Sequence, residues 1–167
     1  VGIEHHGPAD MSRRASCELL ARELGFARDL GGAEFVLHLG AYSPGSNAAE
    51  GMRLFAEGVA EAYAKAPGAP SLTMENVPGG GRRMGGSLEE LAALRVELSA
   101  RGVASGVCLD TAHAWAAGYD VASAVGMDAF LDRASVLFGA GSVTLFHLND
   151  TAAGQGSNRE HHAHWGQ

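Results

Sequence analysis

Four apolar, strand-like runs in this sequence each end in a residue that can bind a metal ion. The four end residues are His38, Glu75, Asp110 and His147. They follow one another at intervals of 37, 35 and 37 residues, the size of one strand–helix unit, and no sequence repeat carries this spacing. A (β/α) barrel builds its active site by placing such residues at the C-terminal end of each successive strand. The spacing therefore predicts a metal site in a barrel, because imidazole and carboxylate groups suit zinc or manganese.

Further candidate ligands lie outside the four strand ends. His113 follows Asp110 by three residues, and Glu160 and His162 stand in a histidine-rich segment near the end of the sequence. Each candidate also has a plainer interpretation. An Asp that opens a helix is most often only an N-cap, Glu75 could belong to a capping pair, and the last histidines could form a solvated tail. Chance explains one such strand end much more easily than four, so the pattern favours a metal site.

The elements that must position these side chains alternate along the chain. Strands are predicted at 34–38, 71–75, 106–110 and 143–147. Helices are predicted at about 11–30 and at 128–138. Another helix is predicted to begin after a cap at Ser46 or Asn47 and to end at Pro67. A fourth is predicted to begin at a capping box formed by Ser87 and Glu90 and to end at Gly102. The polar segment 149–167 is predicted to be a loop.

This alternation is typical of a parallel sheet with right-handed crossovers. With a stub at residues 1–3 the chain supplies about five strands, whereas a closed barrel needs eight. The predicted fold class is therefore α/β, a TIM (β/α)8 barrel. Residues 1–167 are expected to form one partial domain, the central portion of that barrel, incomplete at both ends.

Composition excludes some classes of function. The net charge of −7 over 167 residues argues against an overall electrostatic attraction to nucleic acid, but allows a local basic loop. The segment 77–86, with Arg82 and Arg83 after three glycines, is either such a phosphate-binding loop or simply flexible. Cys17 and Cys108 stand in apolar contexts and are predicted to be buried thiols. No membrane span or signal peptide is visible, so a cytoplasmic protein without membrane contacts is expected.

Several segments resemble the endonuclease IV family, the type 2 apurinic/apyrimidinic endonucleases among the xylose-isomerase-like barrels. The most specific are the D-T-x-H-A-x-x-A-G-Y-D run at 110–120 and the H-L-N-D run at 147–150. The other matches are at 37–40, 74–76, 156–157 and 160–162. The resemblance covers nearly the whole chain from about Pro8. It implies a zinc-dependent hydrolase of DNA repair that cleaves the phosphodiester 5′ of abasic sites in DNA.

The resemblance also implies which residues bind the first two of three zinc ions. His38 would bind the first ion, and Glu75 would bridge the first and second ions as the catalytic residue. Asp110 and His147 would complete much of the shell of the second ion. The ions would activate the attacking water and stabilise charge on the phosphate oxygens.

The third zinc ion would be bound by His113 together with Glu160 and His162. Here the chain departs from the family, which has Asp in place of Glu160, and the extra methylene is expected to shift this ion or weaken its binding. Arg82 and Arg83 would contact the backbone of the DNA partner, although their loop also departs from the composition usual in the family. The protein is expected to be a monomer.

Two ligands of the family would fall outside this sequence, a histidine just before Val1 and a glutamate beyond Gln167. The chain alone is therefore expected to be inactive. The main alternative is a sugar isomerase or epimerase on the same barrel with one or two divalent ions, and a further alternative is a non-catalytic relative. His113 and the Glu160-x-His162 pair favour the nuclease, because a single-metal isomerase does not need them. Metal content separates the three interpretations.

Overall fold

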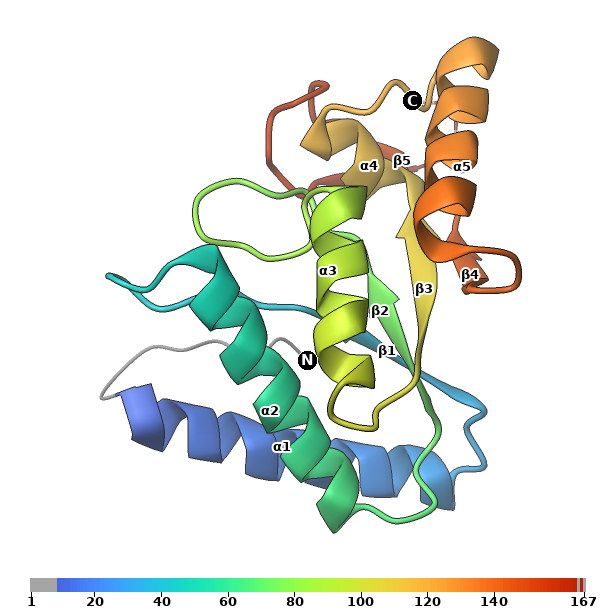
Figure 1. The fold of residues 1–167 in the computed structure, drawn as a ribbon. Helices are drawn as coiled ribbons and strands as arrows, with labels where there is room; N and C mark the ends of the chain where they lie inside the picture. The colour runs from blue at the N-terminus through green and yellow to red at the C-terminus, as the bar shows by residue number, and fades with distance from the viewer. Residues whose placement is uncertain (1–8, 165, 167) are drawn as a thin grey trace.

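The computed structural model describes residues 9–164 and 166, and its helices and strands alternate along the chain (Figure 1). The predicted strand stub at residues 1–3 lies outside the described residues. The helices are α1 (Ala9–Asp29), α2 (Ala48–Lys65), α3 (Leu88–Ser99), α4 (Thr111–Ala117) and α5 (Ala124–Phe138). The strands are β1 (Glu34–His38), β2 (Ser71–Glu75), β3 (Ser105–Asp110), β4 (Val143–His147), β5 (Asp150–Thr151) and β6 (His162–Ala163).

Strands β1 to β4 form one parallel sheet in chain order, and the large helices lie along one side of it (Figure 1). This is the predicted arrangement for consecutive strand–helix units of a barrel. The register pairs His38 with Glu75, and Asp110 with His147. Between the two pairs, Glu75 is level with Cys108, so β3 and β4 extend two residues beyond β1 and β2. The last residues of the four strands nevertheless lie at the same end of the sheet, where the strands have their C-termini.

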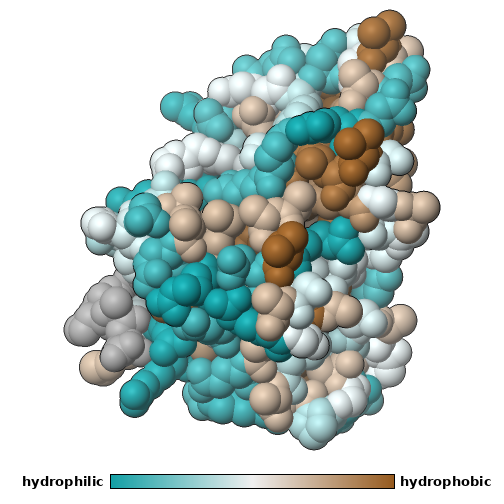
Figure 2. Space-filling view, viewed as in Figure 1, coloured by the Kyte–Doolittle hydropathy of each residue, from teal (hydrophilic) through white to brown (hydrophobic). Residues whose placement is uncertain are grey.

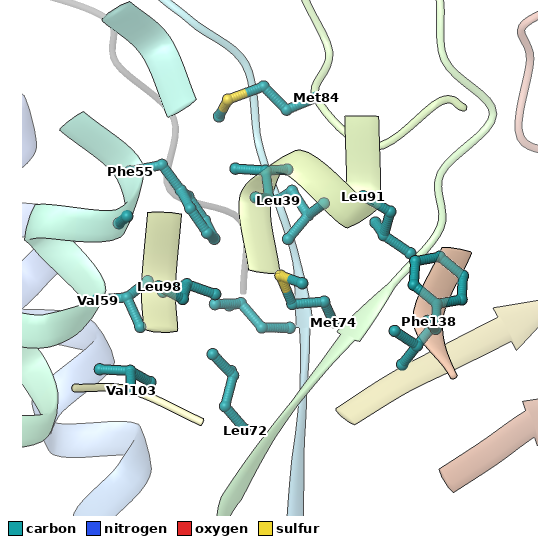
Figure 3. Close-up of a cluster of buried hydrophobic side chains, with 14 of the residues drawn as sticks. Leu39, Phe55, Val59, Leu72, Met74, Met84, Leu91, Leu98, Val103 and Phe138 are labelled. Carbon is teal, nitrogen blue, oxygen red and sulfur yellow. The ribbon is translucent and has the colours of Figure 1, made fainter. Parts of the chain in front are cut away.

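The hydrophobic core lies between the sheet and the helices (Figure 3). On β2, Leu72 and Met74 are fully buried in this core, and the alternation of side chains along a strand places Thr73 and Glu75 on the opposite face. Packing Leu72 and Met74 against the helices, at about 1.5–3 kcal/mol for each side chain, thereby fixes the direction of Glu75. Other large core side chains are Leu39, Phe55, Val59, Leu91 and Leu98.

Short polar side chains begin the helices at the predicted positions. Asn47 caps α2 by accepting a hydrogen bond from the Glu50 N–H at 2.9 Å, and Ser87 caps α3 by accepting one from the Glu90 N–H at 3.1 Å. Each cap contributes about 1 kcal/mol. A capping box also predicts that the Glu90 carboxylate accepts from the Ser87 N–H. This part of the prediction is wrong, because the carboxylate accepts from the N–H groups of Gly85 and Gly86 instead. Glu90 thus fixes the end of the glycine-rich loop.

Two parts of the secondary structure differ from the prediction. Helix α5 begins at Ala124, four residues earlier than expected, because Ser123 caps it by accepting from the Gly126 N–H. The segment after β4 is not only loop, since β5 and β6 pair in antiparallel orientation. Strands of two residues carry too little periodicity to be predicted from sequence.

The outer surface differs between the helices. Figure 2 shows a mainly hydrophilic surface over α1 and α2, with hydrophobic patches over α3 and α5. Exposed valines on these two helices are Val96, Val125 and Val136. Both cysteines are buried free thiols, as predicted. None of the helices in the described part of the chain combines the length and the apolar character that a membrane crossing requires.

Candidate metal centre

The predicted ligands gather where the strands of the sheet end. Glu75, Asp110 and His113 are at most 3% exposed, which is unusual for ionisable side chains. Burial of charged groups is costly unless they are paired, hydrogen-bonded or bound to a metal. Contacts of 2.8 to 3.9 Å connect seven predicted ligands into one cluster, which comprises His38, Glu75, Asp110, His113, His147, Glu160 and His162.

Glu75 lies at the centre of the cluster and shares its two carboxylate oxygens between two histidines. Its Oε2 is 3.0 Å from Nε2 of His38, and its Oε1 is 2.9 Å from Nδ1 of His147. Burial alone would raise the pKa of Glu75, but the hydrogen bonds from both histidines outweigh it and the pKa is lowered. The hydrogen bond to Glu75 raises the pKa of His38. A carboxylate that faces one imidazole with each oxygen has the arrangement required to bridge two cations.

Asp110 caps a helix with one carboxylate oxygen and directs the other oxygen toward the cluster. Its Oδ1 accepts from the His113 N–H at 2.8 Å, so Asp110 is the N-cap of α4. Its Oδ2 accepts from the side-chain amide of Asn149 and lies 3.9 Å from Nδ1 of His147. A carboxylate has about four lone-pair positions, so these bonds leave capacity for a metal ion.

Asn76 is a supporting residue that the sequence interpretation missed. Its side-chain nitrogen donates to the Asp110 carbonyl oxygen at 3.1 Å, and its Oδ1 accepts from the Asp110 N–H at 2.6 Å. Its own carbonyl oxygen lies 2.8 Å from Nδ1 of His113. One buried side chain thus holds the ends of β2 and β3 together. Its position directly after a predicted ligand was the available signal.

The Asn76 carbonyl also sets the tautomer that we assign to His113. A carbonyl oxygen only accepts, so Nδ1 of His113 must carry the proton and Nε2 presents a lone pair. Nε2 faces the last part of the chain, at 3.4 Å from Nε2 of His162 and 3.7 Å from Oε1 of Glu160. Orientation of a ligating histidine by a backbone carbonyl is the usual outer-shell arrangement at metal sites.

These three donor atoms fit a single metal ion. Oε1 of Glu160 is also 3.7 Å from Nε2 of His162, so all three separations lie between 3.4 and 3.7 Å. Tetrahedral zinc with bonds of about 2.0–2.2 Å requires donor separations of roughly 3.4 Å. The extra methylene of Glu160 therefore does not keep its carboxylate out of reach of the two histidines.

Cys108 adds a thiol that the sequence interpretation did not include among the ligands. Its Sγ lies within 4.8 Å of donor atoms of both Glu75 and His147. Burial raises the pKa of the Cys108 thiol to about 12. Because side chains alternate along a strand, a residue two positions before Asp110 shares its face, and this signal could have identified Cys108.

Arg82 and Arg83 lie on the loop between β2 and α3 (Figure 1). Nε of Arg82 donates to the Tyr42 carbonyl oxygen at 3.0 Å. Arg83 donates to the carbonyl oxygens of Gly79 at 3.3 Å and Asn158 at 3.2 Å. Arg82 thus ties the loop to the segment after β1, and Arg83 ties it to the segment just before Glu160.

Comparison with known proteins identifies the family. Residues 3–167 match the model of the family described as xylose isomerase-like TIM barrel. The chain belongs to this family. The predicted fold class is thereby confirmed, with four parallel strands and their helices forming part of the barrel. In a barrel of this kind the cluster lies at the face where active sites are built, since it stands at the C-terminal ends of the strands.

Members of the xylose isomerase-like TIM barrel family resemble the chain to different degrees. The chain is 37% identical over 158 residues to the probable endonuclease 4 of Solibacter usitatus. This match covers 93% of the chain and 54% of that relative. The crystal structure of endonuclease IV from Thermus thermophilus superposes with a TM-score of 0.79 at 35% identity, over 98% of this chain and 55% of the other. The crystal structure of a putative xylose isomerase from Rhodospirillum rubrum superposes with a TM-score of 0.67 at 18% identity, over 89% of this chain and 50% of the other. At this identity the similarity shows the fold alone.

The resemblance to endonuclease IV is confirmed as a similarity in both sequence and structure. The chain spans about half the length of the curated relatives that it matches.

Proposed function

We propose that this chain supplies metal-binding strands of an apurinic/apyrimidinic endonuclease, which hydrolyses the DNA phosphodiester on the 5′ side of an abasic site. Relatives named endonuclease 4 and the crystal structure of endonuclease IV support this substrate class. The proposal concerns the activity of the whole enzyme, because the chain corresponds to about half of these relatives.

The observation that carries the proposal is the way in which the donor atoms are divided. Glu75 stands between His38 and His147, and Nδ1 of His113 lies 3.5 Å from its Oε1. Nε2 of His113 instead faces a separate set of donor atoms, which it forms with Glu160 and His162. Such a division provides for more than one cation, and the separate set has no use in a single-metal isomerase. We propose zinc, because imidazole nitrogen and carboxylate oxygen in a set with donor separations near 3.4 Å suit its tetrahedral shell. Manganese accepts the same ligands and is the alternative ion.

Bound ions would supply Lewis-acid stabilisation of the charge that develops on the phosphate oxygens. The chain itself keeps the ligands in the required states. The two histidines beside Glu75 lower its pKa, so the carboxylate stays ionised despite its burial. The Asn76 carbonyl holds the proton of His113 on Nδ1, and the backbone N–H of His113 holds Asp110. These ligands therefore need little rearrangement before they bind, which is the condition for an effective catalytic site.

The resemblance to endonuclease IV places one histidine and one glutamate of the full ligand set outside residues 1–167. We therefore propose that this range alone binds metal but does not incise DNA. The chain brings together the remaining predicted ligands without these two residues, which supports metal binding by this range.

The test uses the protein at its natural length and a duplex with one abasic site. Incision is measured with and without a chelator, while zinc is counted in the purified protein. We expect chelator-sensitive incision on the 5′ side and about three zinc ions per chain. Metal without incision would replace this proposal with a sugar isomerase or epimerase, to be assayed by sugar turnover. A protein that binds no divalent metal would refute both enzymes.

A further inference from the structure

A group of hydrogen bonds connects the ends of β3 and β4. It is formed by Thr111, which directly follows Asp110, and by Asn149, which lies two residues after His147. The Thr111 hydroxyl donates to the Asn149 carbonyl oxygen at 2.7 Å and accepts from the Asn149 N–H at 3.0 Å. Because both backbone groups of one residue bond to the same hydroxyl, the backbone of Asn149 is held against the first residue of α4.

This backbone position brings the side chain of Asn149 to the carboxylate of Asp110. Its Nδ2 donates to Oδ2 of Asp110, the oxygen that lies 3.9 Å from Nδ1 of His147. The other oxygen, Oδ1, accepts from the His113 N–H. Asn76 acts on Asp110 through the backbone, whereas Asn149 contacts the carboxylate itself. The oxygen that faces the cluster of ligands is thus the one that Asn149 holds.

Burial and charge make the amide of Asn149 well suited to this position. Asp110 is fully buried, so water has no direct access to replace a lost donor. A buried acceptor that loses its partner costs about 1–3 kcal/mol. The amide also donates without carrying a charge, so the negative charge of Asp110 remains available to a cation. A lysine or arginine at this position would neutralise the carboxylate and compete with the ion.

We propose that Asn149 is a positioning residue of the metal centre, which directs Oδ2 of Asp110 toward His147, and that Thr111 sets the position of Asn149. Resting on the proposed function, the inference needs only its metal binding and holds for either reaction that such a centre could catalyse. Loss of an outer-shell partner of a ligating group typically lowers metal affinity about 10–100-fold. A role confined to the fold would lower stability alone.

The test uses the protein at its natural length and the variant Asn149→Ala. Zinc affinity is measured by competition with a chelator, and the free energy of unfolding by denaturant titration of the metal-free protein. Cobalt(II) is a second probe, because its visible absorption spectrum depends on the number and geometry of its ligands. The matched control is Asn47→Ala, which removes the N-cap of α2 and should lower the free energy of unfolding by about 1 kcal/mol.

A second pair of variants tests the part assigned to Thr111. Thr111→Val removes the hydroxyl at nearly constant shape, and Thr111→Ser retains it. Asn149→Ala should lower zinc affinity about 10–100-fold and change the cobalt spectrum, and Thr111→Val should lower zinc affinity about tenfold. Asn47→Ala and Thr111→Ser should retain the wild-type affinity and spectrum.

Three results would overturn the inference. Wild-type affinity and spectrum in Asn149→Ala would show that Asn149 does not position Asp110, while leaving the metal proposal intact. An equal loss of affinity in Asn47→Ala would trace the effect to general destabilisation of the fold. A wild-type protein that binds no metal would overturn the inference together with the proposed function.

Discussion

The metal centre has two halves that are built differently. In the strand half, the carboxylates of Glu75 and Asp110 are at most 3% exposed and hydrogen-bonded on several sides, while the side chains of His38 and His147 are 43% and 35% exposed. The loop half, with Glu160 and His162, has side chains that are 51% and 39% exposed. The strand ligands are fixed by the core beneath them, whereas the loop ligands depend on the two-residue strands β5 and β6. Folding therefore fixes the carboxylates of the first half, and we expect the second half to gain order when an ion binds to it.

The comparison predicts that a substitution in the strand half strongly lowers metal affinity, and does so at more than one metal position. The largest effect is expected for Glu75→Gln, because the amide loses the charge and one of the two oxygens that face His38 and His147. Affinity at the positions on either side of Glu75 should fall by more than the 10–100-fold that is typical when an outer-shell group is lost. Metal counting on the purified variant checks this.

The control for Glu75→Gln is Glu61→Gln, which makes the same change in an exposed carboxylate on α2 that pairs with Lys65. The control should retain its full metal content. Ions bound by His113, Glu160 and His162 should also remain in the Glu75 variant. Full metal occupancy in Glu75→Gln would show that Glu75 is no ligand and would remove the basis for distinguishing the two halves.

The second largest effect is expected for Asn76→Ala, which leaves every predicted ligand in place. The substitution removes both side-chain hydrogen bonds to the Asp110 backbone and leaves buried groups without partners. The free energy of unfolding should fall by about 1–3 kcal/mol, and metal affinity should fall by about 10–100-fold. Denaturant titration and metal titration measure the two quantities. A variant with wild-type metal affinity would show that the strand half does not need this connection between β2 and β3.

The positions of the residues in the strand half could be predicted from sequence for a physical reason. Each strand consists of an apolar run with a polar last residue, so the pattern that forms the core also marks the candidate ligand. His38, Glu75, Asp110 and His147 were all identified in this way, and the parallel register brings them together. Cys108 was not considered as a ligand, although it shares the face of Asp110 two residues later and its Sγ lies within 4.8 Å of donor atoms of Glu75 and His147.

The loop half was less predictable from sequence. Segment 149–167 was expected to be a loop, and nothing in its pattern indicated that β5 pairs with β6 or that Thr151 donates to the His161 carbonyl oxygen. Such contacts join residues about ten positions apart without hydrophobic periodicity. The histidine-rich segment made Glu160 and His162 candidate ligands, and the resemblance to endonuclease IV assigned them to a third ion together with His113. Their distances from His113 required the structure.

A smaller effect is expected for Glu160→Asp, in the loop half. The resemblance alone favours Asp at this position, but Oε1 of Glu160 already lies 3.7 Å from both His113 and His162. Shortening the side chain by one methylene withdraws the carboxylate by about 1.5 Å, so affinity at this position should fall about tenfold. Stability should change by less than about 0.5 kcal/mol, because the side chain is half exposed. Tighter binding in the variant would show that the loop half is not adapted to Glu160.

The smallest effect on metal content is expected for Cys108→Ala. This variant tests whether the strand half includes a thiol ligand. Burial raises the pKa of Cys108 to about 12, so a metal would have to displace a tightly held thiol proton where Glu75 and His147 already present a carboxylate and an imidazole. Metal content should therefore stay unchanged, while the loss of the buried sulfur should lower the free energy of unfolding by about 1 kcal/mol. Cys17→Ala is the matched control, since Cys17 is the other buried free thiol and lies on α1. If metal is lost from Cys108→Ala but not from Cys17→Ala, the strand half binds its ions through sulfur, and its assignment as a purely nitrogen and oxygen site is wrong.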